Sequence, residues 1–119
     1  SGPYLVNGSP DWLSSSDVRL KHRFRDLDAD DLLSRFARMP VTEWSYKAQD
    51  ATVRHIGPTA QNFFAAFGLG SDRLGIGTLD ASGVALAGVK ALEARTRALQ
   101  AEVEALRQQL DALIAKAPQ

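Results

Sequence analysis

A serine hydroxyl and a lysine amine stand five residues apart in the segment SDVRLK, which begins at Ser16 and ends at Lys21. A serine hydroxyl is a poor nucleophile near neutral pH unless a base removes its proton. A lysine is such a base only where burial or nearby positive charge favours its neutral amine. The same spacing fits a polar linker, residues 14–16, that runs into a solvated basic segment, residues 19–25. Taken alone, the spacing favours the linker.

The remaining polar clusters predict no metal or cofactor site. His22 and His55 are the two histidines, and neither cysteine nor clustered acids stand beside them to complete a metal site. The acidic run at residues 26–31 lacks the glycine and the final glutamate of a calcium-binding loop, so the start of a helix explains it better. The glycines within residues 68–77 do not stand between a strand and a helix, as those of a phosphate-binding loop do. We therefore expect neither a cofactor nor a metal.

Length and composition narrow the class of protein. With 119 residues and 45% hydrophobic content, the chain has room for one small soluble domain and an appendage. Fourteen basic and fourteen acidic side chains cancel, so we expect neither nucleic acid nor a membrane as a partner. No apolar run approaches the roughly 20 residues that span a bilayer. The absence of cysteine excludes a disulfide framework and leaves the cellular compartment open.

The segment that holds Ser16 lies between an extended arm and a short helix. Residues 1–15 are rich in Gly, Pro, Asn and Ser, which predicts an arm without a core of its own. Asp28 or Asp30 suits the N-cap of the helix that follows, and Pro40 ends it. The apolar residues of this helix recur at helical spacing and comprise Leu32, Leu33, Phe36 and Met39.

Two short strands are predicted next. Alternation of residue types predicts a half-buried strand over residues 41–47, whose Trp44 and Tyr46 belong to the core. A second strand is predicted over residues 52–56, after a turn at residues 49–50.

A second short helix is predicted from the run TAQNFFAAFG. Thr59 suits its N-cap and Gly68 its C-terminal stop, and the three phenylalanines between them must be buried. A glycine-rich connection follows over residues 69–78. It leads into a short strand over residues 76–79, and Asp80 is expected to cap the last helix.

The last third of the chain, residues 85–115, is predicted to be one amphipathic helix that associates with copies of itself. Its apolar residues alternate at intervals of three and four over about four heptads, which is the pattern of a coiled coil. A helix packed along its own domain is the alternative, but such a helix usually shows a wider apolar stripe. The a positions are Val89, Thr96, Val103 and Leu110, and the d positions are Leu92, Leu99, Leu106 and Leu113.

The flanking charges favour parallel chains, because Glu102 at g can pair with Arg107 at the following e position of a neighbour. Valine at a with leucine at d favours two strands, whereas Thr96 weakens that preference. The heptads therefore predict association without fixing the number of chains.

Four segments, in order, resemble the C-terminal intramolecular chaperone domain of phage endosialidases and tail spikes, of related bacterial surface proteins and of a membrane-bound animal transcription factor. SDVRLK resembles the opening signature of that family, and PVTEWSYK resembles its strand with a tryptophan. HIGPTAQNFFAAFG resembles the start of its second helix, although Pro58-Thr59 and Asn62 depart from the usual residues. TLDASGVALAGVKALEAR resembles the start of its long helix. The resemblance covers residues 16–113.

The resemblance implies a domain that trimerises and assists the folding and assembly of a passenger preceding it. It also implies that the domain then releases itself by cutting the chain between Ser15 and Ser16. Ser16 would be the nucleophile and Lys21 the base, in a site that requires the assembled trimer. The resemblance further indicates a phage virion fibre or a bacterial surface or secreted protein.

Two alternatives stay open beside this self-cleaving chaperone: a trimerisation module that retains its passenger, and a free-standing hydrolase, for which no third catalytic group is evident. The predicted fold class is α+β, a small mixed domain of short helices and short strands followed by a long C-terminal helix in a parallel, trimeric coiled coil. Residues 1–15 are expected to be an arm or the end of the passenger. Residues 16–80 are expected to form the globular domain, and residues 81–117 the coiled-coil helix.

Overall fold

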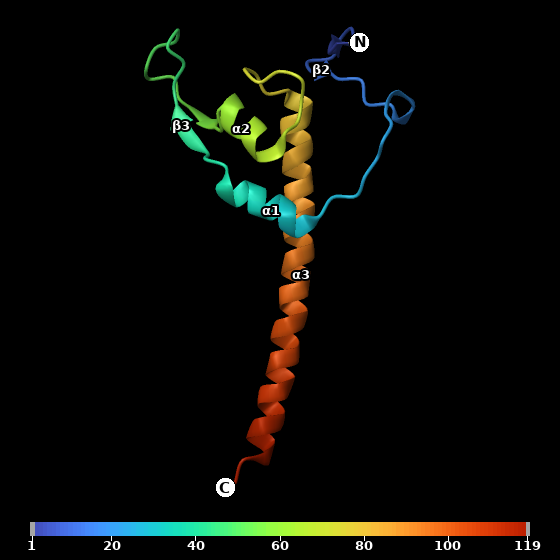
Figure 1. Ribbon diagram of the computed structural model, residues 1–119, viewed down its shortest axis with the longest axis vertical. Helices are drawn as coiled ribbons and strands as arrows, with labels where there is room; N and C mark the ends of the chain where they lie inside the picture. Colours follow the sequence, from blue (N-terminus) through green and yellow to red (C-terminus); the bar gives the residue numbers. More distant parts are fainter. Residues whose placement is uncertain (1, 119) are drawn as a thin grey trace.

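The computed structural model describes residues 2–118, so the first residue of the predicted arm lies outside the described residues. One long helix, α3 (Thr78–Lys116), runs along the molecule, and the smaller elements gather around its N-terminal part (Figure 1). At 1.5 Å per residue, α3 accounts for about 58 Å of the 73 Å long axis. The predicted order, short helices and strands followed by one long helix, is confirmed.

The start of α3 differs from its prediction. Gly77 is the N-cap, so the short strand predicted over residues 76–79 and the cap predicted at Asp80 are both wrong. A strand here would need a partner for its backbone groups, whereas a helix satisfies them locally. Asp80 lies instead in the first turn, where a carboxylate interacts favourably with the positive end of the helix.

The helix α1 (Ala29–Arg38) forms where the acidic run predicted a helix start. Asp28 is its N-cap and accepts a hydrogen bond from the amide of Asp31 at 3.0 Å. Met39 ends the helix in an extended conformation, which the proline after it requires.

The helix α2 (Ala60–Phe67) also matches its prediction. The Thr59 hydroxyl accepts from the amide of Asn62 at 3.1 Å, and Gly68 ends the helix at φ 63°, in the left-handed region that favours glycine. The residues that depart from the family pattern, Pro58-Thr59 and Asn62, therefore still start a helix.

Arg35 joins α1 to the end of α2. Its Nη1 donates to the carbonyl oxygen of Ala66 at 2.8 Å, and its Nε donates to Asp31 at 2.8 Å. A carbonyl in the last turn of a helix has no partner within the helix, so this guanidinium satisfies it and holds the two helices together.

The strand β3 (Thr42–Trp44) pairs antiparallel with β4 (His55–Gly57). Both strands are shorter than predicted, and β4 begins three residues late. The Asp50 carboxylate accepts from the amide of Thr52 at 2.9 Å and from its hydroxyl at 2.7 Å, which holds Thr52 in a turn. The hydrogen bond from the Thr52 amide is the main cause that lowers the pKa of Asp50, and the hydrogen bond from the Thr52 hydroxyl is the second.

The aromatic side chains of this hairpin form a cluster of their own. Trp44 is half-buried, and its Nε1 donates to the carbonyl oxygen of Gly57 at 3.2 Å. Its ring stacks on His55 at 4.9 Å and meets the edge of Tyr46 at 4.8 Å. Tyr46 is 57% exposed, so its predicted place in the core is wrong, because no helix in the described part of the chain packs on the hairpin.

The N-terminal arm contains a second antiparallel pair, β1 (Tyr4–Leu5) with β2 (Trp12–Leu13). The sequence predicted extended chain here but not this pairing. Within residues 2–118, no further helix or strand packs on the pair, and Trp12 is 71% exposed. The arm therefore lies outside the core (Figure 1).

The core lies among the three helices. Phe63 of α2 is buried, and its ring centroid is 5.4 Å from that of Phe67. Phe67 in turn meets the edge of Phe36 of α1 at 5.1 Å. The predicted burial of phenylalanine is confirmed at Phe63, and the other buried apolar side chains of the described part are Leu32, Val84 and Ala91.

A side chain of α1 lies close to the backbone of α3 at Gly88. A Cβ atom at this position would lie 2.8 Å from Cε2 of Phe36 and 3.0 Å from its Cζ. Only a residue without a side chain lets the Phe36 ring rest on the backbone of α3. Asp30 and Arg95 add an ion pair between the same two helices at 3.4 Å.

We predict that Gly88→Ala destabilises the chain by about 1–2 kcal/mol. Overpacking a core costs about 1–3 kcal/mol, and the better helix propensity of alanine returns up to about 1 kcal/mol. Gly83→Ala is the matched control on the same helix, because its added methyl group meets no atom within 4 Å. It should stabilise the chain by up to about 1 kcal/mol. Urea unfolding at one fixed protein concentration measures both, and equal effects would contradict the close contact.

Candidate active site

The structure brings Ser16 and Lys21 into contact. The Nζ atom of Lys21 lies 2.6 Å from Oγ of Ser16, within hydrogen-bond distance. In the ammonium form the amine donates to the hydroxyl, and in the neutral form the same contact lets it accept the hydroxyl proton. This is the geometry required of a nucleophile and its base.

A single turn of 3₁₀-helix, η1 (Val18–Leu20), accounts for the contact. The carbonyl oxygen of Asp17 accepts from the amide of Leu20 at 3.0 Å, and that of Val18 accepts from the amide of Lys21 at 3.2 Å. These bonds fold the segment back on itself. Lys21 then leaves the turn with an extended backbone, and its side chain reaches the serine that precedes the turn.

Asp17 caps this turn, and Arg19 holds Asp17. Oδ1 of Asp17 accepts from the amide of Arg19 at 2.8 Å. The Arg19 guanidinium donates through Nε to both carboxylate oxygens at 3.1 Å and through Nη2 to Oδ2 at 2.7 Å. The hydrogen bonds from the Arg19 side chain are the main cause that lowers the pKa of Asp17, and the hydrogen bond from the Arg19 backbone amide is the second. The Asp17 carboxylate in turn raises the pKa of Arg19.

The contact of Arg19 with Asp17 was not predicted from the sequence. The available signal was an acid and a base two residues apart, next to the serine. That signal is weak in a sequence, because residues at this spacing face each other only when the backbone turns, as it does at η1.

The site lies on the surface of the single chain. Ser16 and Lys21 are both exposed, and within the described part of the chain no helix or strand packs against η1. The chain between β2 and α1 lies apart from α3 and reaches it only at the start of α1 (Figure 1). One copy of the chain therefore leaves the lysine amine in water.

The other polar residues singled out in the sequence serve the fold. His55 belongs to the aromatic cluster, and one ring nitrogen lies 2.9 Å from the side-chain oxygen of Gln49. Asp28 caps α1, whereas Asp31 and Asp30 pair with arginines. His22 is exposed, and residues 2–118 hold no group of three side chains able to bind a metal ion.

The predicted apolar seam of α3 is exposed in the single chain. We call the a and d residues from Val89 to Leu113 the heptad seam. Its apolar members are between 49% and 69% exposed. The residues of α3 buried by the rest of the chain, Val84, Gly88 and Ala91, occupy other heptad positions. A helix packed along its own domain therefore does not explain the heptads, and this exposed apolar surface indicates an oligomer.

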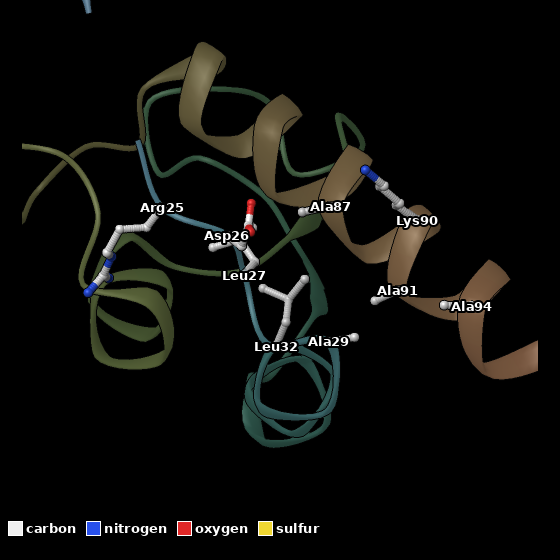
Figure 2. Close-up of a pocket in the computed structure, with 9 residues that line it drawn as sticks. All are labelled: Arg25, Asp26, Leu27, Ala29, Leu32, Ala87, Lys90, Ala91 and Ala94. Carbon is white, nitrogen blue, oxygen red and sulfur yellow. The ribbon is translucent and has the colours of Figure 1, made fainter. Parts of the chain in front are cut away.

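An open cavity of about 450 Å³ lies between α1 and α3 (Figure 2). Its lining combines apolar side chains with the charged side chains of Arg25, Asp26 and Lys90. Neither Ser16 nor Lys21 lines it, and no hydroxyl, thiol or imidazole group does. The cavity is thus separate from the candidate active site. Within residues 2–118, no helix combines the length and the apolar content needed to cross a membrane.

Part of the chain matches a known protein family. Residues 16–68 match the family model described as chaperone of endosialidase, peptidase S74. The matched region begins at Ser16 and includes η1, α1, the β3–β4 hairpin and α2. No curated protein matches the chain.

We predict that the Asp17 carboxyl titrates below its ordinary value of 3.8. Its interaction with Arg19 is present above that lowered pKa and is lost as the pH falls through it. Carbon-13 NMR of the side-chain carboxyl measures the midpoint. Arg19→Gln should raise the midpoint part of the way to the ordinary value, because the hydrogen bond from the backbone amide of residue 19 remains. Arg23→Gln should leave the midpoint unchanged. An equal response to both variants would contradict the specific pair.

Proposed function

We propose that the chain is a self-cleaving intramolecular chaperone, from the premise that residues 16–68 match the family model described as chaperone of endosialidase, peptidase S74. That family implies an intramolecular chaperone role and a passenger. The finer proposal is that three chains assemble through α3, align the passengers that precede them, and then cut between Ser15 and Ser16.

The observation that carries the proposal is the 2.6 Å contact between Lys21 Nζ and Ser16 Oγ. A general base must lie within hydrogen-bond reach of the proton that it removes, and this contact meets that requirement. The serine also directly follows the peptide bond to be cut, so its hydroxyl and the carbonyl carbon of Ser15 belong to the same short stretch of chain.

The proposed reaction has two steps. Ser16 Oγ gives its proton to the neutral amine of Lys21 and forms a bond to the carbonyl carbon of Ser15. The bond from that carbon to the nitrogen of Ser16 breaks, and the nitrogen takes the proton back from Lys21. This leaves an ester between Ser15 and Ser16 Oγ, and water then hydrolyses it to a carboxylate and a free hydroxyl.

Assembly is proposed to complete the site. A lysine in water is almost entirely protonated near neutral pH, and desolvation is the means by which a protein favours the neutral amine. One chain leaves Lys21 exposed, so neighbouring chains must supply the burial. Cleavage would then follow only correct assembly. Loss of the chaperone would in turn leave the passenger kinetically trapped in its assembled form.

The heptad seam supports parallel association. Each buried leucine contributes about 1.5–3 kcal/mol, so the four d leucines together can decide whether the chains associate. Glu102 and Arg107, at g and e, suit an ion pair between parallel neighbours. Parallel helices also place the N-terminal segments of all chains at the same end, as aligned passengers require.

A second candidate is a trimerisation module with the same fold that retains its passenger. The exposure of Ser16 and Lys21 in the single chain favours it. The two candidates differ in only one observable step, the cut at residue 16.

We predict that the assembled 119-residue chain converts to two products, residues 1–15 and residues 16–119. Intact-mass measurement over time detects them. Ser16→Ala and Lys21→Arg should each slow the conversion at least about hundredfold, because one removes the nucleophile and the other cannot supply a neutral amine. Ser14→Ala is the control and should cleave at the normal rate. Full-length chain persisting after assembly would favour the module that keeps its passenger.

We also predict a trimer at micromolar concentration, measured by sedimentation equilibrium. Leu106→Lys should give monomers, because it places charges in the seam. Gln108→Lys adds the same charge two residues away, at an outward-facing heptad position, and should still give trimers. A monomeric or dimeric parent chain would overturn the trimer.

A further inference from the structure

We infer that the β3–β4 hairpin of one copy packs against the η1 segment, residues 16–25, of the neighbouring copy, so that the next chain covers each candidate active site. The inference rests on the parallel association proposed above. It adds the identity of the covering surface, which the heptads do not give.

Two apolar surfaces have no partner in the single chain. The turn surface comprises Val18, Leu20 and Phe24, whose side chains are between 67% and 70% exposed. The hairpin surface comprises Val41 and Ile56, which are 56% and 79% exposed. Within residues 2–118, no helix packs on η1 or on the hairpin. Clustered apolar groups that stay exposed mark sites of interaction.

The strand register decides which face of the hairpin is free. Ile56 pairs with Glu43, and Trp44 follows Glu43 along β3. Successive residues of a strand point to opposite faces, so Ile56 and Trp44 lie on different faces. The face of Trp44 is partly covered by its own chain, because Trp44 lines a cavity with Pro58. The face of Ile56 is the one left for a partner.

The hairpin and the η1 segment lie on opposite sides of α3. Counted back from the heptad seam, Gly88 is a g position, and the Phe36 ring that rests there belongs to the half of α1 that leads into the hairpin. The η1 segment rejoins the fold toward the e side, where Leu27 lines cavities with Lys90 at b and Leu79 at e. Figure 1 shows the hairpin and the η1 segment on either side of α3.

Parallel packing brings these opposite sides together. In a parallel coiled coil, the g side of one helix adjoins the e side of its neighbour. The hairpin of one copy therefore faces the η1 segment of the next. Rotation about a common axis keeps each element at its own height. Both the hairpin and the η1 segment lie level with the first turns of α3 (Figure 1), so their heights match.

The backbone of the η1 segment also supports an external contact. Arg23 has φ 61°, in the left-handed region that residues other than glycine seldom adopt. Such conformations cost free energy and persist where the surrounding structure fixes them. Since no helix or strand of residues 2–118 packs on η1, the neighbouring chain can supply that surface.

The contact would enclose the candidate active site between two chains. Val18 and Leu20 belong to the turn that carries the amine of Lys21 to within 2.6 Å of the Ser16 hydroxyl. A hairpin seated on these apolar side chains removes water from the surface beside that contact. The covering chain thus forms one wall of the proposed site.

Photo-crosslinking tests the contact in the 119-residue chain carrying Ser16→Ala, which keeps the chain intact. A photoreactive benzophenone side chain replaces Leu20, and nitrogen-15-labelled and unlabelled chains are assembled together before irradiation. Mass spectrometry should find position 20 linked to residues 41–57 in peptide pairs of mixed isotope, which join two copies. The same probe in place of Gln108, at an outward-facing heptad position, should give no link to the hairpin.

The result that would overturn the inference is a set of links from position 20 that excludes the hairpin, or hairpin links found only in peptide pairs of one isotope. The second outcome would mean that each hairpin reaches the η1 segment of its own chain.

Hydrogen exchange measures the same contact without a probe. In the assembled Ser16→Ala chain, the amides of residues 18–24 should exchange at least about tenfold more slowly than in a monomeric variant that also carries Leu106→Lys. Ile56→Asp should abolish this protection. Because Ile56 is 79% exposed, the change leaves the packing of its own hairpin in place. Ala101→Asp adds the same charge at an outward-facing heptad position and should keep the protection. Equal exchange in assembled and monomeric chains, or protection that survives Ile56→Asp, would overturn the inference.

Neither measurement requires cleavage, so the two proposals can fail separately. Links between position 20 and a neighbouring hairpin, in a protein whose parent chain never cleaves, would remove the self-cleaving function and leave the contact. A parent chain that cleaves, with no such links in its Ser16→Ala form, would overturn the contact alone.

Discussion

The ring of Phe36 rests on the backbone of α3 at Gly88, and the small domain is attached to the long helix through this contact. Phe36 meets Phe67, and Phe67 meets the buried Phe63, so one ring links all three helices. The constraint is steric, because a Cβ atom at Gly88 would lie 2.8 Å from the Phe36 ring, and the ring or the helix that carries it would have to shift.

This contact also decides which face of α3 is left for other chains. The face that α1 covers is marked by Val84, Gly88 and Ala91, and the pair of Asp30 with Arg95 continues it. Packing on this side leaves the heptad seam uncovered. One helix thus carries two apolar surfaces at different angles, one for its own domain and one for its neighbours. The buried face lies in the first half of the helix, whereas the seam begins in that half at Val89 and continues to Leu113.

Local signals predicted much of this arrangement. The caps at Asp28 and Thr59 and the stop at Gly68 each depend on nearby residues, and each matched its prediction. The strand ends and the hairpin of the arm did not, because hydrogen bonds between distant residues decide them. For the site, the types and spacing of Ser16 and Lys21 were visible in the sequence. The 3₁₀ turn that joins them was not, since a single turn has no periodicity.

The proposed reaction needs two things of the candidate active site: contact between the hydroxyl and the amine, and removal of water from the amine. The segment from Ser16 to Lys21 brings the hydroxyl and the amine together through its own 3₁₀ turn, so the proposed nucleophile and base are in contact in the single chain. Removing water from the amine needs surfaces that this turn does not touch in one chain. Under the proposed function, the contact between serine and lysine therefore forms within one chain, and neighbouring chains would supply the burial. Removing water from the amine of a serine and lysine pair costs free energy. If chains associate through the heptad seam, the free energy of that association can offset this cost.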